Sequence, residues 1–347
     1  MTEEEKHKRF DVVIGNPPYQ QEAHGDSTRA EPIYPEFMSN AYKISKITEL
    51  ITPARFLFNA GQTSKKWNKQ MLNDKHLKVL YYEHDSSKVF DNTDIKGGIT
   101  VTLHDNTKDI GPISVFTPYS ELQHTLKKVQ DKMPESFTKL VSSSGLYRFS
   151  KLIFDEHPDI SNLSGAGTGS KITSKIFSKA SSIFTDERKS SNDLQIIGLI
   201  NNKRFYRFIN EKYIEENNFI NKYKVFVPKA NGSGKLGEQL SSPIIATPNE
   251  IATDTFISIG PVDSKIEASN LLKYIKSKFA RALLGIKKVT QDNPKSTWSC
   301  IPIQDFTDNS DIDWTKSISE IDQQLYKKYD LSQDEIDFIE SHVKEMD

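Results

Sequence analysis

The chain has 347 residues, 27% of them charged and 36% hydrophobic, with a formal net charge of −1. This composition is compatible with a folded protein, and the length favours two domains over one. No run of residues approaches the roughly 20 apolar residues of a membrane span, and residues 2–9 are too polar for a secretory signal. The single cysteine, Cys300, excludes a disulfide framework and a cysteine-based zinc site. We therefore expect a cytoplasmic protein that does not contact a membrane.

Residues 10–19, Phe-Asp-Val-Val-Ile-Gly-Asn-Pro-Pro-Tyr, join a strand signal to an abrupt stop. The β-branched run at residues 12–14 has the pattern of a buried parallel strand. Pro17 and Pro18 cannot continue a strand ladder. Asn16 is therefore expected just past the carboxyl end of a strand, where open α/β sheets place their ligands.

The residues after this strand are suited to holding an aromatic amine. The Asn16 side-chain oxygen and the Pro17 carbonyl are hydrogen-bond acceptors, and two fixed acceptors match the two hydrogens of an exocyclic amino group. Accepting both hydrogens aims the nitrogen lone pair for in-line attack on a methyl group. Tyr19 can lay its ring against a planar base. The alternative is a strand that ends in an ordinary Pro-Pro turn.

The motif Asn16-Pro17-Pro18-Tyr19 resembles the catalytic motif of amino-group DNA methyltransferases, in the tyrosine form that points to adenine N6. Residues 51–57, 89–90 and 97–103 are similar to segments of Eco57I-like restriction–modification methylases. The resemblance implies S-adenosylmethionine as methyl donor and a base flipped out of the duplex. It also implies catalytic roles for Asn16, Pro17, Pro18 and Tyr19.

The segments after the motif predict the second half of a doubly wound sheet. Strands are expected at 47–52, 77–82 and 99–103, with a further one at 112–116, and helices at 35–46 and 55–71. His104 stands where the resembled family has a base-facing aromatic residue, and it is a candidate to stack on the base; a solvated histidine is the alternative. The family's glycine-rich cofactor loop does not precede residue 10, and the glycines at 165–169 follow no strand. The resemblance therefore implies a cofactor-binding half elsewhere, in a longer polypeptide or on a separate chain.

A connecting helical segment at 119–152 is expected to lead into a second domain with strands at 195–200, 223–228, 244–247 and 256–259. Basic and aromatic residues alternate around the first two of these strands, a pattern that suits phosphate contacts and base stacking. Strands with one buried aromatic face are the alternative. The resemblance implies a target-recognition domain here. The candidate DNA contacts are Lys203, Arg204, Arg207, Lys222 and Lys224.

The C-terminal part is predicted to be helical. A helix is expected from Ser264 to about Gly285, then a strand at 298–302. Ser317 with Glu320 and Ser332 with Glu335 have the spacing of capping boxes, which open two acidic helices. The eight histidines lack the spacing of metal ligands.

Together these features predict an α/β protein. A partial doubly wound methyltransferase sheet is expected over residues 1–155, a mixed α+β target-recognition domain over 156–315, and acidic helices over 316–347. The expected function is site-specific adenine-N6 DNA methylation in a restriction–modification system, with S-adenosylmethionine as cofactor and no metal. The expected partners are double-stranded DNA, a chain or domain with the cofactor motif, and a restriction nuclease. The alternative is a non-catalytic DNA-binding or specificity module derived from such a methylase.

Overall fold

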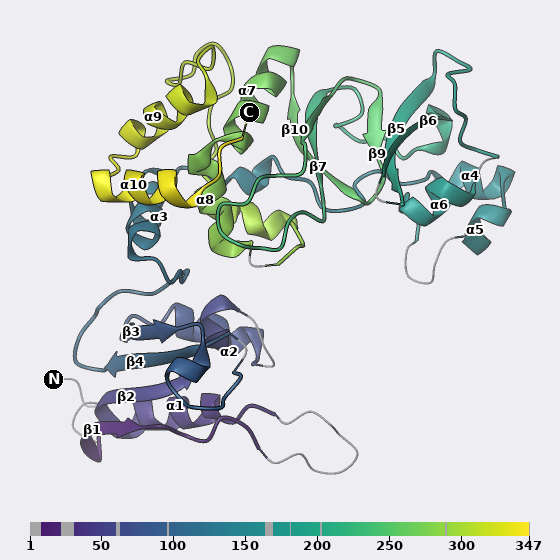
Figure 1. The fold of residues 1–347 in the computed structure, drawn as a ribbon. Helices are drawn as coiled ribbons and strands as arrows, with labels where there is room; N and C mark the ends of the chain where they lie inside the picture. The colour runs from purple at the N-terminus through teal and green to yellow at the C-terminus, as the bar shows by residue number, and fades with distance from the viewer. Residues whose placement is uncertain are drawn as a thin grey trace. The chain divides into compact units, whose positions relative to one another are not determined.

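The chain forms two compact units, Met1–Pro118 and Tyr119–Asp347, in a computed structural model (Figure 1). The structure describes residues 8–21, 31–59, 63–95, 97–163, 169–180, 182–201, 203–288 and 290–346. The division falls earlier than the boundary near residue 155 that the sequence suggested, because the segment after Pro118 packs with the second unit. Four of the five residues of the glycine run at 165–169 lie outside the described residues.

The first unit is built on a mixed sheet of four strands. These are β1 (Phe10–Gly15), β2 (Ser45–Pro53), β3 (Leu77–Glu83) and β4 (Ile99–Asp105), in the order β1-β2-β4-β3. β1 is parallel to β2, and β4 runs antiparallel to both β2 and β3. The carboxyl ends of β1, β2 and β3 therefore meet the beginning of β4 at one edge. The strands expected at 47–52, 77–82 and 99–103 are confirmed, whereas residues 112–116 form no strand.

One face of this sheet is covered by helices. They are α1 (Tyr34–Ile44), the 3-10 helix η2 (Ala54–Phe58) and α2 (Lys65–Leu72), and a short 3-10 turn, η3 (Ser86–Lys88), follows β3. The core beneath them includes Met38, Leu50 and Phe56, with Val13 of β1 packed against it. The single helix expected over 55–71 is wrong, because Asn59 adopts a left-handed conformation (φ 53°) that ends η2.

The opposite face of the sheet carries apolar side chains that the described residues leave open. Successive residues of a strand point to opposite faces, so Val12 and Ile14 point away from the core that holds Val13. Val12 is 51% exposed and Ile14 75% exposed, although the sequence predicted a buried strand here. That prediction is wrong for these side chains because they point to the face of the sheet that the described residues leave uncovered.

The second unit begins with helices and continues with two small sheets. The helical elements are α3 (Ser120–Lys132), η4 (Phe137–Lys139), α4 (Lys151–Glu156), α5 (Asp159–Leu163) and α6 (Ser174–Lys179). One sheet has the order β6-β5-β9, from β5 (Asp193–Ile200), β6 (Lys203–Asn210), which leads into η5 (Glu211–Tyr213), and β9 (Glu250–Ala252). The other has the order β10-β7-β8, from β7 (Tyr223–Pro228), β8 (Ile244–Ala246) and β10 (Phe256–Val262).

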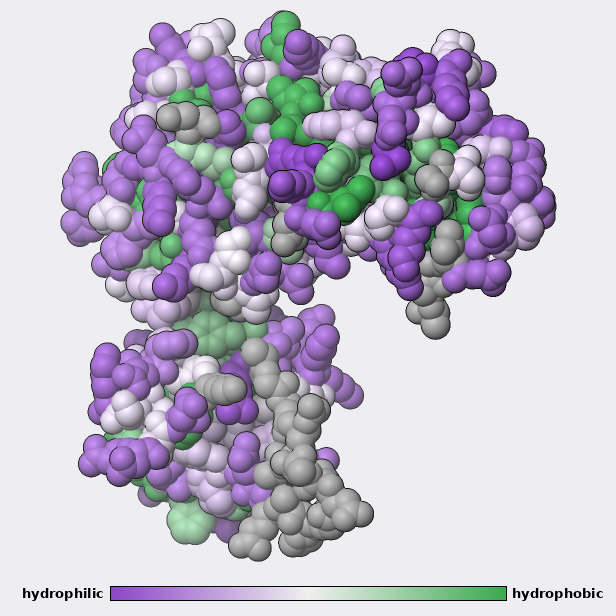
Figure 2. Space-filling model, turned by 45° about the vertical axis from the view of Figure 1, so that its right-hand side comes forward, coloured by the Kyte–Doolittle hydropathy of each residue, from purple (hydrophilic) through white to green (hydrophobic). Residues whose placement is uncertain are grey.

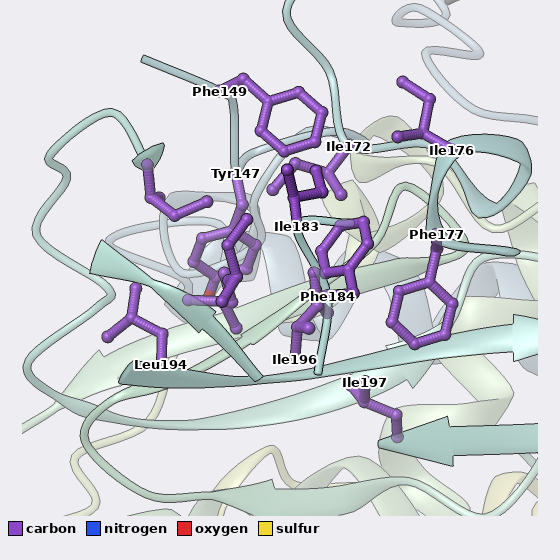
Figure 3. Packing of buried hydrophobic residues seen from close by; sticks show 14 of the residues in the cluster. Tyr147, Phe149, Ile172, Ile176, Phe177, Ile183, Phe184, Leu194, Ile196 and Ile197 are labelled. Carbon is purple, nitrogen blue, oxygen red and sulfur yellow. The ribbon is translucent and has the colours of Figure 1, made fainter. Parts of the chain in front are cut away.

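A cluster of buried aromatic and aliphatic side chains holds the helices of this unit against β5 (Figure 3). Phe149, Phe177 and Phe184 are each at most 2% exposed, and they pack with Ile196 of β5. The strand expected at 195–200 is confirmed, as are those at 223–228, 244–247 and 256–259 to within a few residues. β6 was not predicted as a strand.

The C-terminal part of the second unit is helical. Its elements are α7 (Lys265–Lys276), α8 (Lys278–Lys287), the 3-10 helix η6 (Lys295–Cys300), α9 (Ile318–Lys328) and α10 (Gln333–His342). Both predicted capping boxes, at Ser317 and Ser332, are confirmed. The strand expected at 298–302 is instead largely η6, and the helix expected from Ser264 breaks at Ser277.

The surface in the view of Figure 2 is largely hydrophilic, with apolar side chains in scattered groups. Among the described residues, none of the helices has the length and apolar character needed to cross a membrane.

Candidate functional site

The loop after β1 is held against the beginning of α1. The Ile33 N–H donates to the Tyr19 carbonyl at 3.1 Å, and the Gln21 N–H donates to the Glu31 carbonyl at 2.9 Å. A further antiparallel bridge joins Gln20 to Pro32. These contacts keep the motif in place at the carboxyl edge of the sheet, with Asn16 exposed and Tyr19 half-buried.

A partly open cavity of about 120 Å³ lies beside Tyr19. Its walls come from the loop after β1, the beginning of α1, the end of β2 with η2, and the loop between β3 and β4. The lining residues are Tyr19, Gln20, Pro32, Tyr34, Pro53, Arg55, Thr63, Asp94 and Ile95. Two aromatic rings and several polar groups in so small a space suit a planar heterocyclic ring better than a flexible chain.

Two tyrosine hydroxyls beside this cavity are buried, those of Tyr19 and Tyr34. The Tyr19 hydroxyl has no hydrogen-bond partner among the described residues, whereas the Thr63 hydroxyl is the partner of Tyr34. Burial raises the pKa of both phenols above the usual value of 10. The positive charge of Arg55 and the hydroxyl of Thr63 act against this rise in the pKa of Tyr34. Both hydroxyls are therefore neutral at physiological pH and can donate hydrogen bonds.

His104 lies at the other end of the sheet from this cavity. In the antiparallel pairing of β2 with β4, His104 is opposite Thr48, near the beginning of β2, whereas Ile99 is opposite Pro53 at its end. The His104 ring stacks on Tyr42 with centroids 3.8 Å apart, and its Nε2 is 3.2 Å from the Asp74 carboxylate. With 4% exposure, His104 does not fit the expected role of stacking on a base.

Three of the basic candidates in the second unit lie on the edge strand β6. Lys203 is exposed at its beginning. Arg204 donates to the carbonyls of Ser241 and Ser242 at 3.1 and 2.7 Å. Arg207 forms an ion pair with Asp186 at 3.0 Å. Lys203 is therefore the candidate of this strand that is best placed to meet a phosphate.

The two basic candidates around β7 differ in their surroundings. Lys222 is exposed and forms an ion pair with Asp263. Lys224 is fully buried, and its ammonium donates to four backbone carbonyls. Contact between Lys224 and DNA does not fit this burial, so its role is structural.

Two aromatic side chains next to Lys203 are exposed, Phe205 at 41% and Tyr206 at 48%. They lie on an edge strand, where large apolar groups are more accessible than in the middle of a sheet. Exposed aromatic rings beside a cation form the kind of surface on which nucleic-acid bases stack. Sequence reasoning did not single out Phe205, although it stands within the run Lys-Arg-Phe-Tyr-Arg-Phe.

A site for S-adenosylmethionine is not formed by the cavity beside Tyr19. Small-molecule pockets usually measure roughly 300–1,000 Å³, whereas this cavity measures about 120 Å³. A wider groove of about 840 Å³ runs over α1 and the beginning of α2, and Asn16 and Pro17 line neither this groove nor the cavity beside Tyr19. The described residues also contain no cluster of three or more potential metal ligands.

One family model and one known protein sequence match parts of this chain. Residues 1–90 match the family model of the Eco57I restriction-modification methylase. An uncharacterized adenine-specific methylase from Mycoplasma pneumoniae is 29% identical over 116 residues, which cover 33% of this chain and 27% of that protein. The described residues form a mixed α/β protein, and residues 1–90 are similar to the Eco57I restriction-modification methylases. This similarity agrees with the resemblance expected from the motif at residues 16–19.

Two solved structures are similar over most of this chain at low sequence identity. The type IIG restriction endonuclease BpuSI is 11% identical with a TM-score of 0.32, covering 98% of this chain and 55% of its own. The type IIL restriction-modification enzyme MmeI, solved in complex with DNA, is 9% identical with a TM-score of 0.37, covering 96% and 56%. At these scores neither likeness supports an inference about fold or function. The chain spans about half the length of these two enzymes and about a quarter of the Mycoplasma methylase.

Proposed function

We propose that the chain is the base-holding and DNA-recognition part of a site-specific adenine-N6 DNA methyltransferase of a restriction–modification system. The observation that carries the proposal is the position of Asn16-Pro17-Pro18-Tyr19 at the carboxyl edge of the sheet, where Tyr19 forms part of a cavity wall. In this role the Asn16 side-chain oxygen and the Pro17 carbonyl accept the two amino hydrogens of a flipped adenine. Pro18 keeps the turn rigid, and Tyr19 stacks on the base.

The chemistry that these residues supply is orientation of a weak nucleophile. The amino nitrogen of adenine has its lone pair delocalised into the ring, and two fixed acceptors favour the geometry in which that lone pair is directed outward. S-adenosylmethionine would supply the methyl group. No strong general base is needed among the residues of this chain, because the amino nitrogen would become positively charged on methylation and would then lose a proton to water.

A further structural half, on the same polypeptide or on another chain, is the partner that the proposal requires. The edge of β1 and the open apolar face at Val12 and Ile14 support it, since a strand paired to β1 and a helix over this face would bury them. We propose that this half carries the methyl donor.

The second unit is the part that we propose to bind double-stranded DNA. Lys203 is placed to contact a phosphate, and the exposed Phe205 and Tyr206 could stack on bases or pack against sugars. The family pairs modification with restriction, so a restriction nuclease is the other expected partner.

The proposal is tested by methyl transfer from labelled S-adenosylmethionine to duplex DNA, with the 347-residue chain alone and with a methylase chain that carries the glycine-rich cofactor motif added. Asn16→Ala should abolish transfer while leaving DNA binding intact. Asn40→Ala, which removes an exposed asparagine of α1, is the matched control and should retain activity. Equal transfer by the Asn16→Ala variant and the unsubstituted chain would contradict the proposal.

The alternative is a DNA-binding or specificity module without catalysis. The observation that favours it is the small size of the cavity beside Tyr19, which at about 120 Å³ is well below the volume of a usual cofactor pocket. Salt-dependent DNA binding without methyl transfer under any condition, and without S-adenosylmethionine binding in calorimetric titration, would support this alternative.

A further inference from the structure

A glycine-rich loop after β7 holds a carboxylate on its own backbone N–H groups. The Glu238 carboxylate accepts the N–H of Ser233 at 2.8 Å and that of Gly234 at 3.1 Å. It also accepts a hydrogen bond from the Ser233 hydroxyl. The two N–H groups and this hydroxyl together form an anion nest, a concave arrangement of donors of the kind that binds phosphate.

The backbone of the loop lets an anion come close. Gly232 and Gly234 have positive φ angles of 64° and 93°, which residues with a side chain rarely adopt. A Cβ added to Gly232 would lie 2.0 Å from the Glu238 Oε2, so glycine leaves the room that this oxygen takes. Although burial acts in the opposite direction, the hydrogen bonds from Ser233 and Gly234 lower the pKa of Glu238. The group in the nest is therefore an anion at physiological pH.

Contacts at the base of the loop fix the nest before a ligand arrives. Asn231 is 3% exposed, and its side chain accepts the N–H of Ser241 and donates to the Gln239 carbonyl. The Lys288 ammonium donates to the Asn231 carbonyl at 2.6 Å. The two ends of the loop are thereby joined, and little ordering is needed when an anion binds.

The same loop is attached to β6, the strand that carries the candidate DNA contacts. Arg204 of β6 donates to the carbonyls of Ser241 and Ser242 at 3.1 and 2.7 Å. Lys203 precedes Arg204 and is exposed, and Lys235 directly follows the nest and is also exposed. Phosphates repeat along each strand of DNA, so one duplex can meet β6 and the loop together.

We propose that the anion nest binds a phosphate group of the DNA backbone, and that the Glu238 carboxylate occupies the nest while DNA is absent. This inference rests on the proposed function, because it takes the second unit to be the part that binds DNA. When DNA binds, Glu238 moves out to solvent, and a phosphate oxygen accepts the hydrogen bonds that the carboxylate gives up. The carboxylate competes with DNA, so its removal should strengthen binding.

The first test compares the DNA affinity of Glu238→Gln with that of a matched variant. Competition reduces the apparent affinity to the extent that the nest is closed, and a nest open in roughly a tenth to a third of the molecules predicts a gain of about 3- to 10-fold for Glu238→Gln. Glu267→Gln is the control. Glu267 is also half-buried and accepts the N–H of Asp263 and the hydroxyl of Ser264 at 3.3 and 2.9 Å, but it does so at the beginning of α7. It removes the same charge and should leave the DNA affinity unchanged.

The second test uses the unsubstituted chain. The amide signals of Ser233 and Gly234, observed by NMR with isotope-labelled serine and glycine, should shift saturably when a DNA duplex is added. Inorganic phosphate, compared with chloride at equal ionic strength, separates a free anion from DNA. It should shift the same two signals only at concentrations far above those of the duplex.

Three results would overturn the inference: unchanged or weaker DNA binding by folded Glu238→Gln, an equal gain in Glu267→Gln, or Ser233 and Gly234 signals that shift with inorganic phosphate alone or not at all. Melting temperatures show whether the variants are folded, and the NMR titration decides alone if Glu238→Gln is not. Lys203→Met separates this failure from failure of the proposed function. If that substitution still lowers DNA affinity, the DNA-binding role of the second unit stands and the nest alone is refuted. If the unsubstituted chain does not bind DNA, the proposed function fails as well.

Discussion

Replacing Lys224 by methionine tests whether this lysine is structural or contacts DNA. Its Nζ donates to the carbonyls of Phe219, Ile220, Lys222 and Thr247 at 2.9, 3.2, 3.0 and 2.9 Å. The ammonium thereby ties together the turn before β7 and the end of β8. Its burial is unfavourable and lowers the pKa of Lys224 to about 7, so part of the hydrogen-bond energy is offset.

The expected cost of Lys224→Met follows from the carbonyls that remain. Those of Phe219, Ile220 and Thr247 keep backbone N–H partners, at 3.5, 2.9 and 3.2 Å. The Lys222 carbonyl is the one left unpaired among the described residues, at a cost of about 1–3 kcal/mol. We expect a loss of about 2 kcal/mol, and hence a fall of about 4–8 °C in melting temperature for a unit of this size.

Calorimetric melting and DNA titration together give the decisive comparison, with Lys203→Met as the matched variant. Lys203 is exposed at the beginning of β6, so its replacement should leave the melting temperature unchanged. It should lower DNA affinity and reduce the slope of log K against log salt by about one unit. An unchanged melting temperature for Lys224→Met, with a loss of DNA affinity as large as that of Lys203→Met, would refute the reasoning.

Three further predictions concern the second unit. Burial raises the pKa of Asp322 to about 6 in the folded chain, so the folded state binds the proton more tightly than the unfolded state. The free energy of unfolding should therefore fall by on the order of 3 kcal/mol as pH rises from about 4 to about 6. Asp322→Asn should flatten this pH dependence in denaturant titrations. Ser317→Ala removes a capping box at the beginning of α9 and should cost about 1 kcal/mol of unfolding free energy, whereas Ser310→Ala would serve as a control outside a helix. Tyr206→Ala should weaken DNA binding by about 1–2 kcal/mol without changing the melting temperature, and unaltered affinity would exclude stacking on this ring.

The strands predicted best from the sequence are those with several apolar and β-branched residues close together. None of β2, β5, β7 and β10 is wholly apolar, but each is rich in β-branched or aromatic residues and is present close to its expected position. β6 was missed because an edge strand needs no continuous apolar run, and its exposed side chains alternate charges with aromatic rings. The mixture of basic and aromatic residues was visible in the sequence. It indicates a strand only once residues 203–210 are known to pair with β5.

Features that depend on residues far apart in the sequence could not be predicted from local sequence patterns. The break between α7 and α8 occurs where the Ser277 hydroxyl caps α8 and the Asp322 carboxylate accepts the N–H groups of Lys278 and Phe279. No pattern in the sequence near Ser277 indicates that Asp322 will lie beside it. The misplacement of His104 has the same origin, because the direction of β4 relative to β2 decides which end of that strand faces the cavity.

Part of the candidate site could have been found from the sequence. The motif residues were predicted from their own chemistry, and Tyr34 precedes Pro35 at the first turn of α1, where proline commonly opens a helix. That signal places Tyr34 at a helix start, but not beside Tyr19. Tyr34 lies near Tyr19 because the chain at residues 31–33 pairs with the loop after β1. Such a pairing has no local sequence signature.

The exposure of β1 differs from the burial that its composition predicts, and this difference bears on how the chain assembles with a partner. The residues at 12–14 have the composition of a strand buried on both faces, yet Val12 and Ile14 are more than half exposed, and they lie beside the open edge of the sheet. A long apolar edge strand favours aggregation, and proteins usually protect such strands with charges, prolines or covering elements. The surroundings of Val12 and Ile14 in β1 offer one charged residue, Asp11, which forms an ion pair with Lys46. Burial of Val12 and Ile14 would take an element packed over their face of the sheet, and protection of the edge would take a strand paired to β1. The proposed cofactor-binding half would provide both.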